Sequence, residues 1–243
     1  MKDLIDVHTH TTASGHAYST LQENISAAKA KGLALVGISD HAPSMPGSAP
    51  NFHFANFRVI PREMDGIKIV MGVELNIIDY AGSTDLPEKY LRRIDYAIAS
   101  LHDTCIDAGT VAQNTSAIIG AMKNSHVVII GHPDNPSYPV DFEKIARAAA
   151  ESHVLLEVNN SSYQAGGYRA GSRDNAKIML AACKKYGAEI IMGSDAHFCS
   201  EVGNHALSQE VLRENNFPPE LVVNYDVEKF FEHLKFRKNS LPV

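Results

Sequence analysis

The run IKIVMGVEL at residues 67–75 decides the fold class. It is almost entirely apolar and rich in Ile and Val, and it lacks the polar–apolar alternation of a strand with one face in water. Runs of this kind are typical of strands that are buried on both faces, as in parallel sheets covered by helices. We therefore predict a buried parallel strand here, and this strand also holds an acidic residue, Glu74.

Six further runs of the same character are spaced along the chain, at residues 4–7, 33–39, 96–101, 127–131, 154–158 and 189–193. Helical patterns lie at 20–32, 141–152 and 172–187, and two more follow the last run, at 204–215 and 226–236. Seven strands that alternate with helices indicate an α/β fold, and this number of units normally closes into a TIM-like (β/α) barrel. We predict one domain over residues 1–243. An open doubly wound sheet would show the same alternation and stays as the alternative.

Composition argues against several classes of function. The 243 residues carry a net charge of −6, and nothing in them suggests the basic surface that nucleic-acid-binding proteins use. The three cysteines form no C-x-x-C pair, which fits reduced thiols in a cytoplasmic protein. No apolar stretch approaches the ~18 residues of a membrane span, and no glycine-rich nucleotide signature follows any run. The proline-rich, aromatic segment 42–63 is expected to be a loop or lid.

The residues at the ends of the runs predict a metal site. In barrels the active site lies at the carboxyl ends of the strands, and histidines stand at five of the seven ends here. Match counting gives the odds of this by chance as on the order of once in a thousand. The residues at or near the strand ends are His8, His10, His41, Glu74, His102, His132, Asn159, Asn160, Asp195 and His197. Imidazoles grouped with two carboxylates suit zinc, iron or manganese.

These motifs, in this order, resemble those of the PHP family (polymerase and histidinol phosphatase). They are DVHTH at 6–10, His16, SDH at 39–41, GVE at 72–74, LHD at 101–103, GHP at 131–133 and GSDAH at 193–197. The segments HFANFRVIPRE at 53–63, EVNNSS at 157–162 and RAGSRDN at 169–175 are most similar to its stand-alone, YcdX-like phosphatase branch. The resemblance implies a distorted (β/α)7 barrel, three divalent metal ions per chain and phosphoesterase activity.

The resemblance also implies how the ligands are divided among the ions. One ion would be held by His8, His10, Glu74 and Asp195. A second would share Glu74 and take His102 and His132, and a third would take His16, His41 and His197. His16 is singled out by the resemblance alone. Zinc is the metal we expect first, with manganese or iron as alternatives. Asp6, Asp40 and Asp103 flank ligand histidines, and we expect them to orient imidazoles.

The predicted reaction is hydrolysis of a phosphate ester. A hydroxide that bridges two metal ions is a strong nucleophile at neutral pH, and we expect it to attack phosphorus directly, with Glu74, Asp195 and His197 as catalytic residues. The expected substrate-binding residues are Arg169, Arg173 and Asn159, since a guanidinium can bind phosphate oxygens bidentately. The expected substrate is a small-molecule phosphate ester, without a membrane or nucleic-acid partner, and a homo-oligomer is compatible with the sequence.

Three alternative functions remain open at this point. An amidohydrolase-like enzyme that cleaves C–N bonds also begins with a His-x-His strand. Such enzymes often bridge their metals with a carboxylated lysine, however, where this chain has Glu74. A phosphodiesterase that acts on nucleic-acid ends would use the same ligands. A non-catalytic metal-binding PHP module is disfavoured by the complete ligand set.

Overall fold

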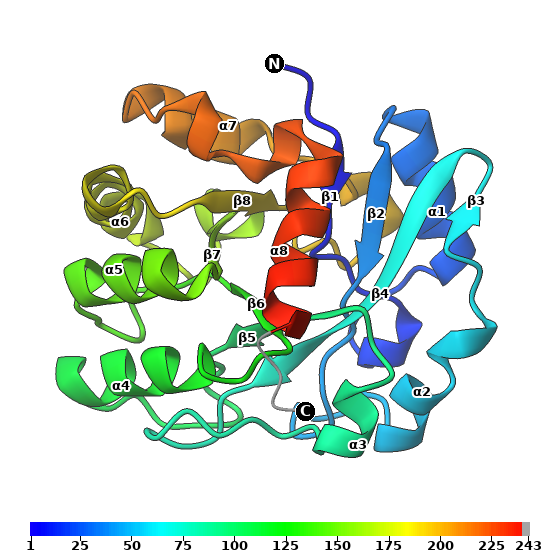
Figure 1. Ribbon diagram of the computed structural model, residues 1–243, viewed down its shortest axis with the longest axis horizontal. Coiled ribbons are helices and arrows are strands. Elements are labelled where there is room, and N and C mark those ends of the chain that lie inside the picture. The colour runs from blue at the N-terminus through cyan, green and yellow to red at the C-terminus, as the bar shows by residue number, and fades with distance from the viewer. Residues whose placement is uncertain (240–243) are drawn as a thin grey trace.

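The structure is a computed structural model that describes residues 1–239, and its main feature is a set of seven parallel strands that follow one another in chain order (Figure 1). These strands are β1 (Ile5–Asp6), β2 (Leu35–Ile38), β4 (Ile67–Asn76), β5 (Tyr96–Ser100), β6 (Val127–Ile130), β7 (Leu155–Asn159) and β8 (Ile190–Gly193). A two-residue strand, β3 (Glu63–Met64), pairs antiparallel with β4. Each run predicted as a strand therefore forms one, within a few residues of its predicted bounds.

The sheet closes on itself through the segments that follow its first and last strands. Thr9 and Ala196 form a parallel bridge just beyond β1 and β8, and the His10 backbone N–H donates to the Ala196 carbonyl at 2.9 Å. A doubly wound sheet would instead reverse its strand order and leave two open edges. The alternative fold is thus wrong, and the predicted single-domain barrel is confirmed.

One end of the barrel is filled by apolar side chains and covered by the last helix, α8 (Val227–Asn239), which crosses the front of the barrel in Figure 1. Phe230 and Leu234 of α8 pack against interior residues of the strands. Arg237 donates to backbone carbonyls that precede β6 and β7, including that of Ser152, so α8 lies at the amino ends of the strands. Polar groups inside the barrel therefore gather at the opposite, carboxyl end.

Tyr96 occupies the middle of this interior, and two features of the chain accommodate it. Its hydroxyl donates to the Val7 carbonyl at 2.5 Å, which satisfies the only polar group of the buried side chain. Gly72 leaves the space that the ring needs, because a Cβ at that position would lie 2.4 Å from a ring carbon. The ring thereby supports the backbone of Val7, the residue immediately before His8.

Helices cover the outside of the sheet: α1 (Leu21–Ala30), α4 (Val111–Ala121), α5 (Phe142–Ser152), α6 (Ser172–Tyr186) and α7 (Ala206–Glu214). The five helical segments predicted from the sequence correspond to α1, α5, α6, α7 and α8. No helix was predicted at α4, although Thr110 and Gln113 form a capping box at its start. The segment 42–63 contains only the short helix α2 (Asn51–Ala55) and one 3-10 turn, while α3 (Glu88–Leu91) is a single turn. Within residues 1–239, no helix has the length and apolar character of a membrane span.

Candidate metal centre

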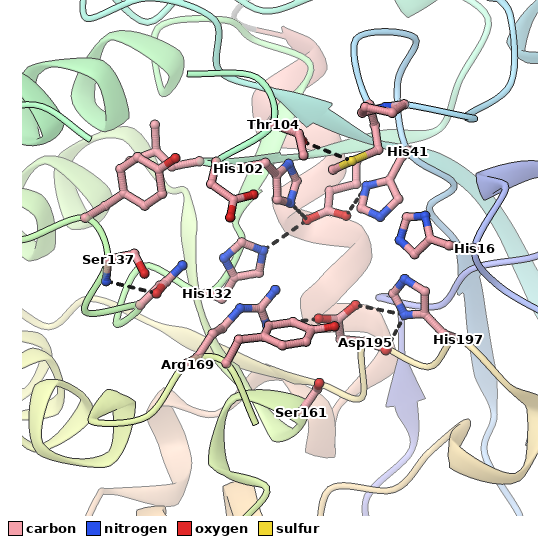
Figure 2. A pocket seen from close by; sticks show the side chains of 18 residues that line it. His16, His41, His102, Thr104, His132, Ser137, Ser161, Arg169, Asp195 and His197 are labelled. Atoms are coloured by element: carbon pink, nitrogen blue, oxygen red, sulfur yellow. Dashed lines mark hydrogen bonds and ion pairs between the residues drawn. The ribbon is translucent and has the colours of Figure 1, made fainter. Parts of the chain in front are cut away.

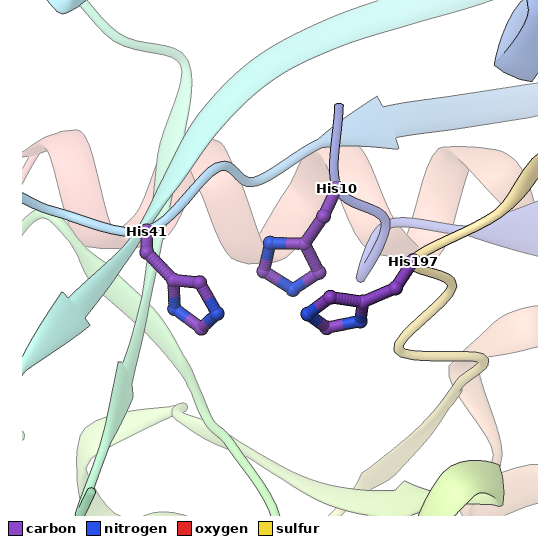
Figure 3. Close-up of side chains that lie close together, drawn as sticks. All are labelled: His10, His41 and His197. Carbon is purple, nitrogen blue, oxygen red and sulfur yellow. The ribbon is translucent and has the colours of Figure 1, made fainter. Parts of the chain in front are cut away.

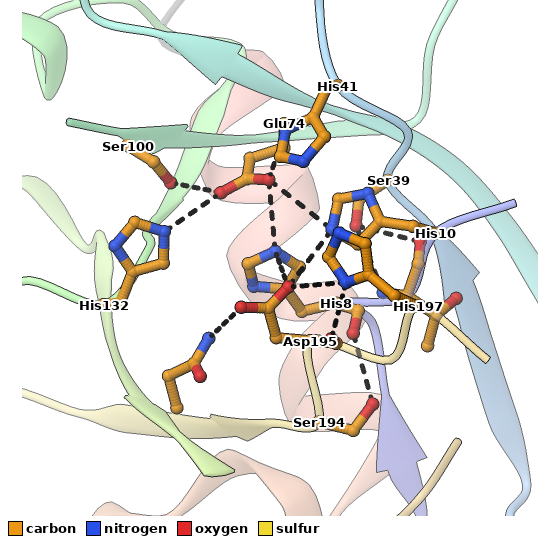
Figure 4. Close-up of polar contacts among 12 residues, drawn as sticks. His8, His10, Ser39, His41, Glu74, Ser100, His132, Ser194, Asp195 and His197 are labelled. Carbon is orange, nitrogen blue, oxygen red and sulfur yellow. Dashed lines mark hydrogen bonds and ion pairs between the residues drawn. The ribbon is translucent and has the colours of Figure 1, made fainter. Parts of the chain in front are cut away.

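Glu74, near the end of β4, lies at the centre of the histidines that follow the other strands (Figure 4). Its Oε1 atom is 3.2 Å from Nε2 of both His102 and His132, and its Oε2 atom is 2.8 Å from Nδ1 of His41. The Ser100 hydroxyl donates to Oε1 at 2.7 Å. The two oxygens of this buried carboxylate thus face two different sets of histidines, which is the geometry that a bridging ligand requires.

His8 and His10 approach the same carboxylate from the end of β1. Their Nε2 atoms lie 3.4 and 3.5 Å from Oε2 of Glu74. The same two atoms lie 3.6 and 3.3 Å from Oδ1 of Asp195, which follows β8. Residues two apart on an extended chain share a face, so the His-x-His spacing directs both imidazoles into the barrel.

A second group forms where His10, His41 and His197 turn their ring nitrogens toward one another (Figure 3). The His10 ring centroid lies 4.4 Å from that of His41 and 4.3 Å from that of His197. His16 stacks on the outer side of this group, 5.0 Å from His41 and 4.8 Å from His197. The nine residues expected as metal ligands therefore lie together at the carboxyl end of the barrel.

The groups of potential ligand atoms differ in part from the division that the resemblance implies. Three sets have ligand atoms within 4.8 Å of one another: His8 with His10 and Glu74, His41 with Glu74 and His102, and His10 with His41 and His197. The first set agrees with the implied first ion. In the other two, His41 stands beside Glu74 as well as beside His197, and His10 belongs to two sets.

Four buried polar atoms at this centre have no hydrogen-bond partner within residues 1–239. They are His8 Nε2, His10 Nε2, His41 Nδ1 and Glu74 Oε2. A buried polar atom that lacks a partner costs about 1–3 kcal/mol, so four of them in one place need an explanation. They point toward a common centre and are typical zinc, iron or manganese donors. The residues present therefore fit divalent metal ions.

Two residues of the centre also have an unusual backbone conformation. His132 has φ of +30° and Asp195 has φ of +56°, the left-handed region that side chains other than glycine rarely adopt. Each lies two residues after the end of a strand, β6 for His132 and β8 for Asp195, and the turn at each position aims the side chain back into the barrel. Strained backbone of this kind concentrates at functional sites.

Hydrogen bonds made by Nδ1 orient several of these imidazoles. Nδ1 of His8 is 2.6 Å from Glu157 Oε1, Nδ1 of His102 is 2.7 Å from Asn76 Oδ1, and Nδ1 of His10 is 3.1 Å from Ser14 Oγ. Each of these contacts turns Nε2 toward the centre. The sequence analysis missed Glu157, Asn76 and Ser14, because no spacing rule links them to the histidines that they contact.

The three aspartates expected to orient imidazoles have different positions. Asp40 accepts hydrogen bonds from the hydroxyls of Ser14 and Thr11 and thus acts on His10 through Ser14. Asp6 accepts from the backbone N–H of His8 at 3.3 Å and not from its ring. Asp103 is exposed at the pocket wall. We expected Asp103 to contact the His102 ring, but Asn76 makes that contact instead.

Electrostatics favour ionised carboxylates and some neutral imidazoles here. Burial raises the pKa of Glu74, but the charges of His8 and His41 hold that pKa well below its usual range. Burial lowers the pKa of His10 to about 3, with a further contribution from His41. Burial and then Arg169 lower the pKa of His132 to about 4. Carboxylates and neutral imidazoles are the protonation states that bind metal ions.

A pocket of about 680 Å³ opens onto this centre (Figure 2). Glu74, Asp195 and several of the histidines line the pocket, and we call this part its floor. Arg169 projects into the pocket from one side. Apart from Asp103, its walls combine apolar and uncharged polar side chains, namely Met45, Pro46, Leu101, Thr104, Asn135, Ser137, Tyr138, Ser161 and Tyr168. The charged floor and the mixed walls suit a ligand with an anionic end and a mostly uncharged body.

The three residues expected to bind substrate lie in three different environments. The Arg169 guanidinium lines the pocket and lies 3.1 Å from Asp195 Oδ2. Asn159 is fully buried behind the pocket, where its side-chain amide donates to Asp195 Oδ2 at 3.3 Å. Arg173 is not brought to the pocket, because it lies in the first turn of α6 and forms ion pairs with Glu210 and Glu214 of α7.

Comparison with known proteins shows similarity along the whole chain. The family model described as the PHP domain matches residues 6–165. A protein of Acetivibrio thermocellus named probable phosphatase is 47% identical over 241 residues, which cover 99% of each chain. The names of such relatives confirm the prediction of a phosphoric ester hydrolase.

Solved structures confirm the fold at much lower sequence identity. A histidinol phosphate phosphatase from Lactococcus lactis, in complex with zinc, L-histidinol and phosphate, has a TM-score of 0.58 and 17% identity. The match covers 89% of this chain and 95% of that one. A chain from archaeal ribonuclease P with mature tRNA has a TM-score of 0.59 and 16% identity, over 97% of this chain and 91% of that one. The same fold thus occurs in a histidinol phosphate phosphatase and in a chain of archaeal ribonuclease P.

Proposed function

Because the chain belongs to the PHP family, we propose that it is a metal-dependent phosphatase that hydrolyses a small-molecule phosphate ester at a site for three divalent ions. The observation that carries this proposal is the set of orphaned buried atoms around Glu74, which comprises three imidazole nitrogens and one carboxylate oxygen. Zinc is the first candidate, with manganese or iron as alternatives. We also propose that residues 1–243 act as one catalytic domain in the cytoplasm.

The residues that would hold the ions are those expected from the resemblance: His8, His10, His16, His41, Glu74, His102, His132, Asp195 and His197. When bound, the ions would activate water at neutral pH and neutralise the phosphate group. Two ligand carboxylates against three divalent ions leave a net charge of about +4, which attracts a phosphate dianion. Glu74, Asp195 and His197 line the pocket floor, where they would contact the reacting groups.

Arg169 supplies the fixed positive charge beside this floor. Its Nη1 atom lies within reach of Asp195 Oδ2 and the Ser162 hydroxyl, at 3.1 and 3.2 Å. These contacts hold one edge of the planar guanidinium and leave its other N–H groups for phosphate oxygens. A charge-assisted, bidentate contact of this kind would orient the ester for attack in line with its leaving group.

The pocket walls support a small ester with one phosphate group. Among the described residues that line the pocket, Arg169 is the only Lys or Arg side chain, so a second phosphate would find no cation outside the metal centre. Within residues 1–239, Asp103 is the only carboxylate that lines the pocket away from the metal centre. A nucleic-acid end would bring further backbone phosphates, each of which normally needs a basic contact.

A panel of esters tests this function. The metal-loaded protein should release phosphate from small monoesters and should leave amides such as cyclic imides intact. Phosphodiesters and 3′-phosphorylated oligonucleotides form the second arm of the panel. Hydrolysis of amides alone would favour the amidohydrolase-like alternative, whereas inactivity on every phosphate ester would contradict the proposal.

A further inference from the structure

Glu157 of β7 contacts the metal centre from behind, and the sequence analysis gave it no role. We propose that Glu157 is the positioning residue of this centre, which fixes the His8 imidazole and the His132 backbone so that both present Nε2 to metal. The inference rests on the proposed metal site. Glu157 is 1% exposed and does not line the pocket, so it acts on substrate only through the residues that it holds.

The first contact sets the tautomer of His8. Glu157 Oε1 lies 2.6 Å from Nδ1 of His8, and a carboxylate in this position accepts a hydrogen bond from the Nδ1–H group, so the proton stays on Nδ1. Nε2 of His8 is then the ring nitrogen left for a metal ion, and this atom has no partner and faces Glu74 Oε2 at 3.4 Å. Carboxylate partners of this kind fix the ring orientation of ligand histidines and strengthen them as metal donors.

The second contact holds a strained turn. Glu157 Oε2 accepts from the His132 backbone N–H at 2.8 Å, at the residue whose φ is +30°. The left-handed conformation at a residue other than glycine costs roughly 1–3 kcal/mol unless its surroundings impose it. With the N–H held, Nε2 of His132 lies 3.2 Å from Glu74 Oε1, on the side of the bridging carboxylate opposite His8.

The third contact links the same oxygen, Glu157 Oε2, to Asp195 through the side chain of Asn159. The side-chain amide of Asn159 donates to Glu157 Oε2 at 3.0 Å and to Asp195 Oδ2 at 3.3 Å. One buried carboxylate thus connects three of the expected ligands, which come from the ends of β1, β6 and β8. Such a carboxylate is costly to bury unless each of its oxygens is bonded, and here both are.

The neighbouring strand leaves space for this carboxylate. Gly193, the last residue of β8, has no side chain, and a Cβ there would lie 2.0 Å from Glu157 Oε1 and 2.9 Å from the His8 Cβ. Any side chain at this position would displace Glu157 or His8. The glycine of the GSDAH motif therefore belongs to the same arrangement as the carboxylate.

The test compares two Glu-to-Gln substitutions by their zinc affinity, without substrate. In Glu157→Gln, the amide cannot accept from His8, His132 and Asn159 together, so we expect the zinc dissociation constant to rise about 10–100-fold in chelator competition. The control is Glu189→Gln, because Glu189 pairs with His233 and Lys229 at the α8 end of the barrel. The control should bind zinc like the wild type even where its thermal unfolding temperature falls.

Several outcomes would overturn the inference. Unchanged zinc affinity in Glu157→Gln would remove Glu157 from the site, and equal losses in both variants would reduce its role to general stability. If the wild-type chain itself binds no zinc, manganese or iron, the proposed function fails, and this result is distinct from either of the others.

A measurement on the wild-type chain applies even if Glu157→Gln does not fold. Long-range ¹H–¹⁵N spectra of the zinc-loaded protein report which ring nitrogen of each histidine carries a proton. The His8 signals can be assigned by their absence in His8→Gln. We expect a protonated Nδ1 and a metal-bound Nε2 for His8, and a metal-bound Nδ1 would contradict the role of Glu157.

Discussion

His41 Nδ1 lies 2.8 Å from Glu74 Oε2, and both atoms are buried without a hydrogen-bond partner within residues 1–239. His41 follows β2 and Glu74 lies in β4, and neither of the two atoms serves as a hydrogen-bond partner for the other. A shared metal ion, as we propose, would resolve this arrangement, because both atoms could donate to it at once.

Removal of the Glu74 carboxylate should disable the centre. In Glu74→Ala, the group of His8 and His10 and the group of His41 and His102 lose their common ligand. We therefore expect kcat to fall by more than the 10–100-fold typical of losing an outer contact. Metal content should fall with it, as elemental analysis will show. Glu143→Ala, at an exposed ion pair with Lys185 on the outside of the barrel, is the control and should keep full activity. A fully active Glu74→Ala protein would rule out a bridging role.

Arg169 and Arg173 should differ sharply, although they are only four residues apart. Arg169→Ala removes the pocket guanidinium, so KM for a phosphate monoester should rise. The ratio kcat/KM should fall about 10–100-fold, because one hydrogen bond to a charged group contributes about 1.5–3 kcal/mol. Arg173→Ala breaks only half-exposed ion pairs with Glu210 and Glu214 and should change KM less than about twofold. Equal effects in steady-state kinetics would show that the pocket does not bind phosphate through Arg169.

Stability at alkaline pH should depend on His205. This imidazole is buried between Asp3 and Asp6; burial alone lowers its pKa, but its contacts with the two carboxylates raise that pKa to about 10. Its pKa in the unfolded chain is about 6.5. The protonated ring therefore stabilises the fold fully below about pH 6.5, and this contribution is lost as pH rises through about 10.

The corresponding measurement is the free energy of unfolding in urea from pH 7 to pH 10. His205 alone should lower it by about 1.4 kcal/mol per pH unit over this range. His205→Gln should be less stable at pH 7 and should show a shallower decline. Parallel curves for the two proteins would mean that His205 is not held in its charged form.

Tyr96→Phe should destabilise the barrel without altering its catalytic groups. The substitution leaves the Val7 carbonyl without its hydroxyl donor, and an unsatisfied buried carbonyl costs about 1–3 kcal/mol. The midpoint of urea unfolding should fall accordingly, while metal content stays at the wild-type value. An unchanged midpoint would show that the carbonyl finds another donor.

The strand ends could be predicted from the sequence because each buried run stops at a polar residue. His102 and His132 follow such runs directly and His41 follows one after Asp40. A closed barrel brings strand ends together whatever their separation in sequence. His16 is different, because it lies in the loop after a 3-10 turn at Thr12–Ser14 and no strand ends near it. Only the resemblance to a family singled it out.

Other features of the centre depend on contacts that cannot be recognised from the pattern of neighbouring residues in the sequence. Glu157 sits in the apolar run of β7, and its role depends on Gly193 one strand away and on the conformation of His132. Arg169 and Arg173 look equivalent in the sequence. The structure separates them because α6 begins at Ser172, so Arg169 stays in the loop beside the pocket while Arg173 faces α7.

The most direct test of the central claim is a zinc titration of the metal-free chain, with phosphate release from p-nitrophenyl phosphate measured at each addition. If the proposed site for three ions is correct, chelator-treated protein is inactive and activity returns as zinc is added, reaching its maximum near three ions per chain. Activity that survives complete removal of metal would contradict the account, as would a chain that binds fewer than two ions.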